Sequence, residues 1–415
     1  MPAPPPDHRA AVHREWLLDW LARHLGRSAA EDEPLYECEL DSVAALSLCG
    51  DVEQEFGPLL EPGDVWSCRT VRDLAALMCD RDERRGGPRP PQAAFFFSGQ
   101  GGGRPRTTRN LYRHSHGYRR HLHAVDDVLS PLVGASVVAA VAGDRTGSTG
   151  SAGTALDQAA SFAVGYALAR TLEESGVAPV AVLGHGLGEI AAAAFAGALT
   201  LPDASRLVAL RGALTERLVP AGHGGMTATC VSGRDTATLL EGEPEVTVAV
   251  LNASRSTVLA GPVEALERVE GRLSRRGSRH RRLPVRYAFQ SPLLAPVADE
   301  LRSAVEPLPA LRPRLPFYST VRGRLHDEPP TTAYWAEQLV SPVLFADAVR
   351  ALLVQRRPTH VVELGPGTVL TPYVRGLGGP VCVAACRGPR SNAVDLAGVV
   401  AALDAGPLSE QLAGA

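Results

Sequence analysis

The nine residues Val182-Leu183-Gly184-His185-Gly186-Leu187-Gly188-Glu189-Ile190 decide how the larger part of this chain folds. The apolar residues 180–183 predict a strand, the small residues after them a tight turn, and the alanine-rich run 191–198 a helix. This is the context of a nucleophile elbow, in which Gly-x-Ser-x-Gly exposes a serine hydroxyl on a strained turn. Backbone N–H groups at the helix start would face a developing oxyanion. The serine itself is missing, because Gly186 stands at the elbow position.

The composition narrows the possible functions. A chain of 415 residues has room for two or three domains, and 45% hydrophobic with 21% charged residues is typical of a globular protein. A net charge of -3 favours neither nucleic acid nor a membrane surface as partner. Lysine is absent, which excludes Schiff-base chemistry on lysine. The seven cysteines lack metal or redox spacing, and no signal peptide or membrane-length apolar run occurs. We therefore expect a cytoplasmic protein without a metal site.

The first eighty residues show helical patterns. Apolar residues recur at helical spacing over 11–26, which predicts an amphipathic helix. Ser42 is placed to cap a second helix over 43–56, and Gly57 is placed to end it. A third helix is predicted after Thr70. Carboxylates far outnumber arginines on this segment: Glu31, Asp32, Glu33, Glu37, Glu39, Asp41, Asp51, Glu53, Glu55, Glu61, Asp64 and Asp73.

Residues 11–80 resemble an acyl carrier protein of the polyketide and fatty-acid type. The resemblance rests on Leu40-Asp41-Ser42-Val43 and on Val65-Trp66-Ser67-Cys68-Arg69-Thr70-Val71. It implies a small all-α four-helix carrier bundle in which Ser42 carries 4′-phosphopantetheine, attached by a phosphopantetheinyl transferase. The thiol of that arm would hold an acyl chain as a thioester. From the residues alone, Ser42 can also be no more than a helix cap.

A change of composition separates this segment from the rest. Residues 81–92 are rich in proline, glycine and arginine and predict a semi-rigid linker. A buried strand is expected over 93–97, followed by the glycine-rich turn 98–103. Because no Gly-Lys-Ser/Thr or dinucleotide fingerprint follows, we do not expect this turn to bind phosphate.

The remaining sequence alternates strand and helix patterns, which predicts an α/β core. A more β-rich piece over 225–286 predicts a small α+β insertion. The last strand is expected at 361–364, and a linker with a short helix is expected over 386–415.

Residues 93–385 resemble an acyltransferase domain of the malonyl-transacylase and modular polyketide synthase type. The matching motifs are, in order, Ser98-Gly99-Gln100-Gly101, Gln158, the elbow 184–189, Arg211-Gly212, Phe317-Tyr318-Ser319-Thr320-Val321, Tyr334-Trp335, Pro342-Val343 and Glu363-Leu364-Gly365-Pro366-Gly367. The resemblance implies a multidomain chain, with the carrier bundle followed by an α/β hydrolase-like acyltransferase fold that holds a ferredoxin-like α+β insertion.

The sequence differs from this family at two positions that carry the family's catalytic side chains. In that family the elbow serine is the nucleophile, and a histidine further along is its base. Here Gly186 replaces the serine, and Gln290 stands at the histidine position of Tyr287-Ala288-Phe289-Gln290-Ser291. A glutamine amide is not basic enough to take a hydroxyl proton near neutral pH. Losing both members of such a pair costs on the order of 10⁶ in turnover. We therefore expect an inactive acyltransferase in the family's usual sense.

Other positions of the family site are kept. The resemblance implies an oxyanion hole at the backbone N–H groups of Gln100 and Leu187. It also implies that Arg211 pairs with an acyl carboxylate, a geometry that suits a guanidinium. Arg211 can equally be a surface or core-bridging arginine. His185 is either a substrate contact or a packed imidazole.

Several further groups are candidates to replace the missing nucleophile or to bind a partner. Ser98, Cys230, Ser291 and His185 lie in or near matched motifs, but none has a recognisable base beside it. A run of arginines precedes Gln290 and is either a solvated face or a docking surface for an acidic carrier domain. Its members are Arg272, Arg275, Arg276, Arg279, Arg281, Arg282 and Arg286.

The sequence thus predicts a carrier protein of polyketide or fatty-acid-like biosynthesis, with an acyl thioester on Ser42, fused to a catalytically inactive acyltransferase-like domain that acts in docking or positioning. The expected partners are acyl-CoA or acyl-carrier thioesters and a separate acyltransferase or ketosynthase. The alternative is an active acyl-thioester enzyme, a transferase, decarboxylase or hydrolase, that uses a non-standard site. The acyl group and the pathway product stay open.

Overall fold

The computed structural model describes residues 6–25, 29–38, 40, 42–85, 91–101, 105–143, 153–377 and 380–403. The chain divides into two compact units, Met1–Pro90 and Pro91–Ala415, and each is described by itself. No helix in these ranges is both long and apolar enough to cross a membrane. Nor do the described residues include a group of three or more His, Cys, Asp or Glu side chains that could hold a metal ion.

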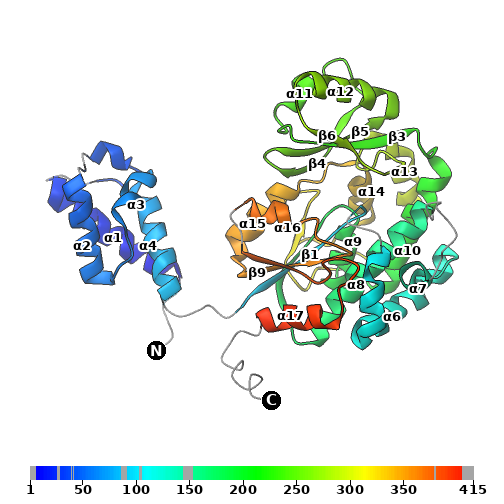
Figure 1. Ribbon diagram of the computed structural model, residues 1–415, viewed down its shortest axis with the longest axis horizontal. Coiled ribbons are helices and arrows are strands. Elements are labelled where there is room, and N and C mark those ends of the chain that lie inside the picture. The colour runs from blue at the N-terminus through cyan, green and yellow to red at the C-terminus, as the bar shows by residue number, and fades with distance from the viewer. Residues whose placement is uncertain are drawn as a thin grey trace. The chain divides into compact units, whose positions relative to one another are not determined.

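The first unit is a helical bundle, as the sequence predicts (Figure 1). Its elements are α1 (Pro6–Leu25), the 3₁₀ turn η1 (Leu35–Cys38), α2 (Ser42–Phe56), α3 (Pro62–Ser67) and α4 (Val71–Arg85). The helices close around their own buried core of Leu17, Leu21, Leu48, Val52, Leu74 and Met78.

Two helix ends of the bundle differ from expectation. Helix α1 begins at Pro6, five residues before the predicted start, because proline is well tolerated in a first helical turn. Helix α4 continues to Arg85, into the predicted linker. Gly57 does end α2: its φ is 83°, and its N–H donates to the carbonyl oxygen of Glu53 at 2.9 Å.

The second unit is built on a six-stranded sheet in the order β10-β9-β1-β2-β7-β8. The strands are β1 (Ala93–Phe97), β2 (Pro179–Gly184), β7 (Phe317–Ser319), β8 (Arg324–Leu325), β9 (His360–Leu364) and β10 (Val381–Ala384). All neighbouring pairs are parallel except β7 with β8. The strand expected at 361–364 is present as β9, but it is not the last one, because the short apolar run of β10 adds an edge strand beside it.

Helices cover both faces of this sheet, which explains why β1 is apolar at every position. Phe95 and Phe97 pack on Phe195 on one face, whereas Phe96 packs on Phe345 on the other. The helices are α5 (Arg109–His114), α6 (His116–Val133), α7 (Val137–Ala142), α8 (Thr154–Glu174), α9 (Gly188–Phe195), α10 (Leu201–Leu218), α13 (Ala295–Ala304), α14 (Thr332–Val340), α15 (Phe345–Arg356), α16 (Thr371–Arg375) and α17 (Ala393–Leu403), with 3₁₀ turns η2 (Pro105–Thr108) and η3 (Pro292–Leu294).

The insertion is a separate four-stranded antiparallel sheet above the larger sheet in Figure 1. Its elements are β3 (Gly224–Thr229), α11 (Thr236–Leu239), β4 (Thr247–Ala253), β5 (Ser256–Pro262), α12 (Val263–Arg275) and β6 (His280–Arg282). The element order β-α-β-β-α-β and the strand order β4-β5-β3-β6 confirm the ferredoxin-like prediction. A small core that includes Leu259, Leu266 and Leu273 holds α12 on the sheet.

Candidate functional site

The predicted site lies where two central strands end. Strands β1 and β2 are parallel neighbours, with Phe97 in register with Gly184. The turn after β1 and the elbow after β2 therefore meet at the carboxyl edge of the sheet, where open α/β folds bind ligands. A β-carbon on Gly99 would lie 3.4 Å from the backbone nitrogen of Leu187. This contact brings together the two segments that the sequence assigned to an oxyanion hole.

The elbow needs its glycines for space and for backbone conformation. A β-carbon on Gly184 would lie 2.3 Å from Cα of Glu189, and one on Gly188 would lie 2.3 Å from the carbonyl oxygen of Phe97. Gly186 adopts a φ of 54°, in the left-handed region that other residues enter only at a cost. The strained turn of a nucleophile elbow is thus present, without a side chain at its tip.

Gln290 faces this tip. The end of its side chain lies 3.3 Å from the position that a β-carbon on Gly186 would occupy. The amide nitrogen of Gln290 donates to the carbonyl oxygen of Ser341 at 3.0 Å and to that of Gln338. In this orientation the amide oxygen is the atom nearest Gly186, so an acceptor of very low basicity points at the elbow. Gln290 is 5% exposed and has a φ of 58°, so its backbone is also held in the left-handed region.

The two predicted oxyanion donors are available. Helix α9 begins directly after Leu187, and the N–H of Leu187 donates no hydrogen bond within the described part of the chain. The same holds for the N–H of Gln100 among the described residues. Free N–H groups at a helix start are suited to a carbonyl oxygen that gains negative charge.

A line of hydrogen bonds links Gln100 to the predicted carboxylate-binding residue. Both amide side chains, Gln100 and Gln158, donate to the hydroxyl oxygen of Thr154, at 3.0 and 3.3 Å. Arg211, on α10, donates from Nη1 to the side-chain oxygen of Gln158. Thr154 and Gln158 both belong to α8. This helix therefore positions Gln100 at one end of the line and Arg211 at the other.

Arg211 is a buried cation that has no counter-ion among the residues that the structure describes. Its side chain is 2% exposed, its Nε has no hydrogen-bond partner, and its guanidinium carbon lies 6.0 Å from the ring centre of Phe289. No carboxylate pairs with it among the described residues. Burial therefore lowers the pKa of Arg211 to about 10. The interpretation of Arg211 as a surface residue is wrong, and its free Nε could donate to an anionic group.

His185 lies between the elbow and the insertion. Its Nε2 lies 2.9 Å from Oδ1 of Asn252 on β4, and its ring packs on Phe345. Burial lowers the pKa of His185, so its neutral form is favoured. Asn252 was not found from the sequence, which offers no local signal for a contact between β4 and the elbow.

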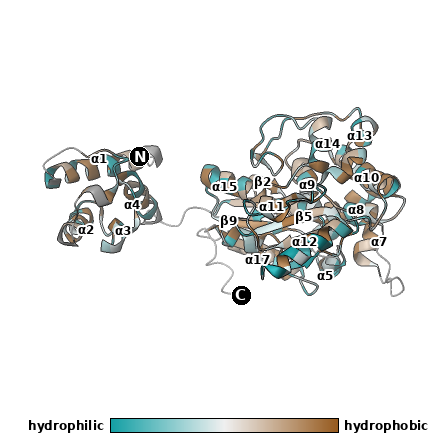
Figure 2. Ribbon diagram, turned by 90° about the horizontal axis from the view of Figure 1, so that it is seen from above, coloured by the Kyte–Doolittle hydropathy of each residue, from teal (hydrophilic) through white to brown (hydrophobic). Residues whose placement is uncertain are grey.

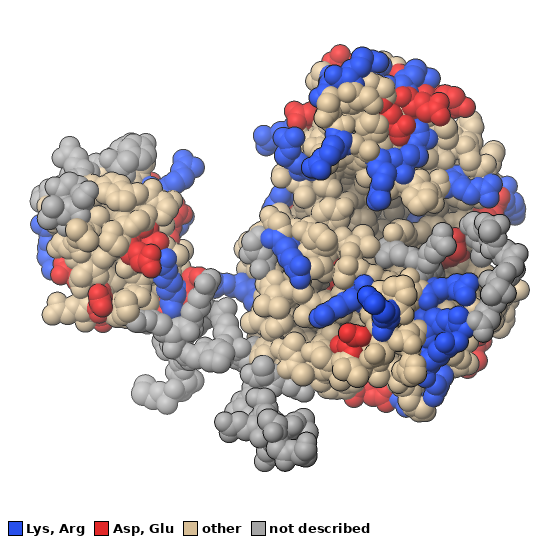
Figure 3. Space-filling model, in the orientation of Figure 1, with Lys and Arg blue, Asp and Glu red and all other residues tan. Residues whose placement is uncertain are grey.

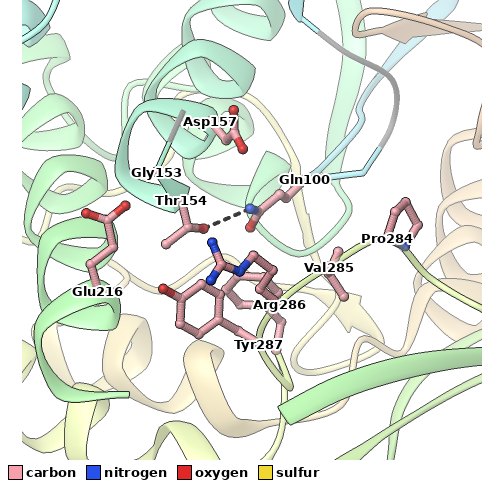
Figure 4. A pocket seen from close by; sticks show the side chains of 10 residues that line it. Gln100, Gly153, Thr154, Asp157, Glu216, Pro284, Val285, Arg286 and Tyr287 are labelled. Carbon is pink, nitrogen blue, oxygen red and sulfur yellow. Dashed lines mark hydrogen bonds between the residues drawn. The ribbon is translucent and has the colours of Figure 1, made fainter. Parts of the chain in front are cut away.

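A pocket of about 240 Å³ opens beside these residues (Figure 4). It is lined by Gln100, Gly153, Thr154, Asp157, Glu216, Pro284, Val285, Arg286, Tyr287 and Phe289. Figure 4 shows the guanidinium of Arg286 pointing into this space, toward Thr154. Gln100 and Phe289 are common to the pocket and to the surroundings of the elbow and Arg211, so the pocket adjoins the site.

The hydroxyls and the thiol considered as substitute nucleophiles are occupied or remote. Ser98 donates to the carbonyl oxygen of Leu364, and Ser291 donates to that of Ala288 at 2.7 Å. Both side chains are buried. Cys230 is exposed and follows β3 of the insertion.

Glu189, directly after the elbow, is a functional candidate that the sequence did not single out. It is fully buried and accepts hydrogen bonds from the N–H of Thr320 at 2.8 Å and the hydroxyl of Tyr334 at 2.7 Å. Burial raises the pKa of Glu189 to about 7. Helix α14 also supplies Gln338, whose side-chain amide donates to the carbonyl oxygen of Gly186 at 2.6 Å. Two side chains of α14 therefore hold the elbow by hydrogen bonds, one to Glu189 and one to the carbonyl oxygen of Gly186.

The predicted attachment residue belongs to the other unit. Ser42 is the first residue of α2, and only its backbone is described. Asp41, which precedes it in the motif, lies outside the described residues.

Two family models match the chain. An acyl transferase domain matches residues 94–378, and a phosphopantetheine attachment site matches residues 15–78.

The curated relatives are much larger proteins. The chain is 36% identical over 316 residues to the spectinabilin polyketide synthase system protein NorA' of Streptomyces orinoci, and 38% identical over 294 residues to polyketide synthase GfsB of Streptomyces halstedii. Each match covers 70% of this chain but only 9% and 5% of the relative. Erythronolide synthase EryA2 of Saccharopolyspora erythraea is 35% identical over 283 residues, 8% of its length. The chain thus spans less than a tenth of each of these synthases.

Solved acyltransferases have the same fold. A loading acyltransferase from the avermectin modular polyketide synthase superposes with a TM-score of 0.69 at 32% identity, covering 75% of this chain and 99% of that one. The acyltransferase domain from the second module of the salinomycin polyketide synthase gives 0.69 at 29% identity, covering 90% and 96%.

Proposed function

This chain belongs to the acyl transferase family of polyketide synthases, joined to a phosphopantetheine carrier domain, and from that premise we propose a carrier with a binding-only acyltransferase fold. Ser42 carries the phosphopantetheine arm. The acyltransferase fold receives a carboxyacyl thioester and holds it without forming an acyl-enzyme. In this role the second unit positions or shelters the acyl group for a partner ketosynthase, or recruits a separate acyltransferase that loads the carrier.

The facing pair Gly186 and Gln290 carries the proposal. Acyl transfer through a serine ester needs a hydroxyl at one of these positions and a base at the other. Gly186 offers no atom that can form the ester, and the Gln290 amide cannot take a proton. The oxyanion donors and substrate binding alone provide about 10³–10⁴ over the reaction in water, which is on the order of 10⁶ short of the turnover of an intact site.

The retained residues support binding. Arg211 provides a buried guanidinium whose Nε is free, which suits the carboxylate of a malonyl-type group. The N–H groups of Leu187 and Gln100 are free to donate to the thioester oxygen. His185, held by Asn252, borders the same space. A site that had lost all function would have no reason to keep a buried, unpaired cation, which costs free energy in the empty protein.

The same retained groups support one alternative, turnover of an acyl thioester by an unfamiliar route. Hydrolysis would need a base for water, and the side chain nearest the elbow is Gln290. Decarboxylation is opposed by Arg211, because a carboxylate paired with a guanidinium is stabilised in the ground state and resists loss of CO₂. Release of free malonate or of an acetyl thioester from malonyl-CoA, abolished by Arg211→Ala, would establish this alternative.

Intact-protein mass spectrometry tests the proposal. The chain is treated with a phosphopantetheinyl transferase and CoA, and then with malonyl-CoA. The proposal predicts a gain of one phosphopantetheine and no malonyl group, until a separate active acyltransferase is added. Malonyl transfer by the chain alone at ordinary enzymatic rates contradicts it.

A further inference from the structure

Helix α8 begins without a cap of its own. Its N-cap residue is Gly153, which has no side chain and therefore makes no capping hydrogen bond. The first N–H groups of a helix have no partner within the helix and need an acceptor from elsewhere. Here Oε1 of Glu216 accepts the N–H of Ala155 at 2.9 Å. A carboxylate from α10 therefore takes the place of the missing cap.

The two helices approach each other closely at this point. A β-carbon on Gly153 would lie 2.1 Å from Oε1 of Glu216, and one on Gly212 would lie 2.5 Å from Cα of Ala155. Gly212 and Glu216 are four residues apart on α10, so they lie on one face of that helix. Both glycines are thus needed for the carboxylate to reach the first turn of α8.

The turn that Glu216 holds also carries the middle of the site. Thr154, the first residue of α8, accepts hydrogen bonds from the side-chain amides of Gln100 at 3.0 Å and Gln158 at 3.3 Å. Gln158, one turn further along, accepts from Nη1 of Arg211. The line of hydrogen bonds from Gln100 to Arg211 therefore depends on the turn that Glu216 holds.

The rest of α8 is fixed in another way. Residues 159–172 are largely apolar and buried (Figure 2), so packing in the core holds this part of the helix. The first turn, 154–158, is only partly buried, so hydrogen bonds matter more to its position. Helix ends fray when their N–H groups lose their acceptors. Loss of the bond to Glu216 would therefore loosen the first turn and leave the remainder of α8 in place.

The charge of Glu216 does not favour an anionic ligand. Glu216 and Asp157 are the two carboxylates that line the pocket of about 240 Å³, and no arginine pairs with Glu216 among the described residues. Arg286 points into the same pocket (Figure 4), and further arginines gather over the insertion (Figure 3). On charge alone, Glu216 opposes the carboxylate that Arg211 would bind. The contact with α8 and the charge of Glu216 thus have opposite expected effects on binding.

We propose that Glu216 is a positioning residue of the site, which holds the first turn of α8 so that Gln158 keeps Arg211 in place for the carboxylate of the acyl group. This inference rests on the proposed function, in which Arg211 binds a carboxyacyl thioester. Glu216 acts through its acceptor oxygen and not through its charge. Because Thr154 belongs to the same turn, the bond from Glu216 positions Gln100 as well.

Two substitutions separate the contact from the charge. Gly153→Ala keeps the charge of Glu216 but places a methyl group against its Oε1, so the contact with Ala155 breaks. Glu216→Gln removes the charge but keeps an acceptor oxygen for that N–H. Glu216→Ala removes both. The control is Glu173→Ala, which removes the same charge at an exposed residue that pairs with Arg170, about 27 Å further along α8.

The affinity for malonyl-pantetheine tests the proposal. Its Kd for the full-length chain without a phosphopantetheine arm is measured by calorimetry, with circular dichroism to show that each variant is folded. We expect Gly153→Ala and Glu216→Ala to weaken binding about fivefold, which is within the range that loss of a helix cap produces. Glu216→Gln and Glu173→Ala should stay within about twofold of the parent.

The sign of the effect decides between contact and charge. Binding that is unchanged in Gly153→Ala, or tighter in Glu216→Ala, would show that the contact with α8 has no role and would overturn the proposal. Where Glu216→Ala does not fold, Gly153→Ala alone decides.

A double-mutant cycle tests the route through Gln158. In a Gln158→Met background α8 no longer bonds to Arg211, so Glu216→Ala should weaken binding by less than about twofold more. A fivefold loss in both backgrounds would mean that Glu216 acts on the ligand directly, against the proposal. Failure of the proposed function looks different. A parent chain that binds malonyl-pantetheine no better than acetyl-pantetheine has no carboxylate site, whatever the variants do.

Discussion

The side chain of Gln290 ends 3.3 Å from the position that a β-carbon on Gly186 would occupy, so these two residues face each other across the elbow. The rest of the site is in place around them. Gln338 holds the Gly186 carbonyl oxygen at 2.6 Å, and the Leu187 N–H is free among the described residues. The elbow is therefore assembled around a position that has no side chain and faces an amide.

Restoring both side chains should restore acylation. We expect Gly186→Ser with Gln290→His to gain at least about 100-fold in acylation from malonyl-CoA, since a positioned base contributes about 10²–10⁴. Serine at this φ of 54° costs about 1–2 kcal/mol, which the fold should tolerate. Peptide mass spectrometry would place the ester on the introduced serine. Each single variant is the control and should stay at the level of the unmodified chain. A folded double variant that remains silent would show that something other than this pair blocks the reaction.

Arg211 should make binding depend on a carboxylate. A ligand present at 100 times its Kd stabilises by about 2.7 kcal/mol, or several degrees of Tm. We expect malonyl-pantetheine, with its carboxylate, to raise the Tm of the intact chain by this amount, and acetyl-pantetheine to have little effect. Arg211→Met should abolish the shift, because it removes the buried cation.

The matched control for Arg211 is Arg217→Met, an exposed arginine on the same helix that pairs with Glu300. This variant should keep the malonyl-dependent shift. Equal shifts with malonyl and acetyl ligands, or a shift that survives Arg211→Met, would refute the role of Arg211.

Glu189 should make the stability of the second unit fall as pH rises. Burial raises its pKa from 4.5 to about 7, so the folded state favours the protonated carboxyl. Its contribution is fully present below pH 4.5 and is lost as pH rises through about 7, an effect on the order of 3 kcal/mol. The free energy of unfolding in urea, measured at pH 5 and at pH 8, gives the size of this loss. Glu189→Gln should flatten this dependence.

Glu337, on α14, has a pKa that is lowered, whereas the pKa of Glu189 is raised. The hydrogen bond from Arg322 lowers the pKa of Glu337, so its contribution is present above pH 4.5 and is lost as pH falls through the lowered pKa. Glu337→Gln should therefore leave the loss between pH 5 and pH 8 unchanged. If Glu189→Gln has the same pH dependence as the parent, Glu189 does not titrate in this range.

Ser42 should be the single site of the arm. We expect one phosphopantetheine on the chain after treatment with a phosphopantetheinyl transferase and CoA, and none on Ser42→Ala. Ser47, exposed on the same helix, provides the control, and Ser47→Ala should be modified fully. Modification that persists in Ser42→Ala would move the attachment to another residue.

Most of the fold was predictable, because its signals are local. Alternation of strand and helix patterns, the glycines of the elbow and the β-rich insertion each lie within a few residues of sequence. The additional strand β10 was missed because its four residues give too short a pattern to separate from a loop. The early start of α1 was missed because the proline-rich start gives no apolar periodicity before residue 11.

The site was predictable where a family motif covers it and not elsewhere. Gly186, Gln290, Gln100 and Arg211 fall in matched motifs, and the structure brings them to one edge of the sheet. The contacts of the elbow with Asn252 and Gln338 join distant segments, and no local pattern announces them.

The titration of Glu189 could not be predicted either. It depends on complete burial among Thr320 and Tyr334, which only the packed structure shows. The same acid at an exposed helix start would have an ordinary pKa.

A binding-only acyltransferase fold is tested by the rate at which the chain, with phosphopantetheine on Ser42, takes malonyl from malonyl-CoA without any other protein. Intact-protein mass spectrometry follows the reaction beside Ser42→Ala and at several protein dilutions. For the binding-only role we expect no malonyl adduct on the timescale of enzymatic turnover, and full loading once an active acyltransferase is added. Self-loading at about 1 s⁻¹ or faster, unchanged by dilution, would contradict it and would show that the acyltransferase fold has a working nucleophile.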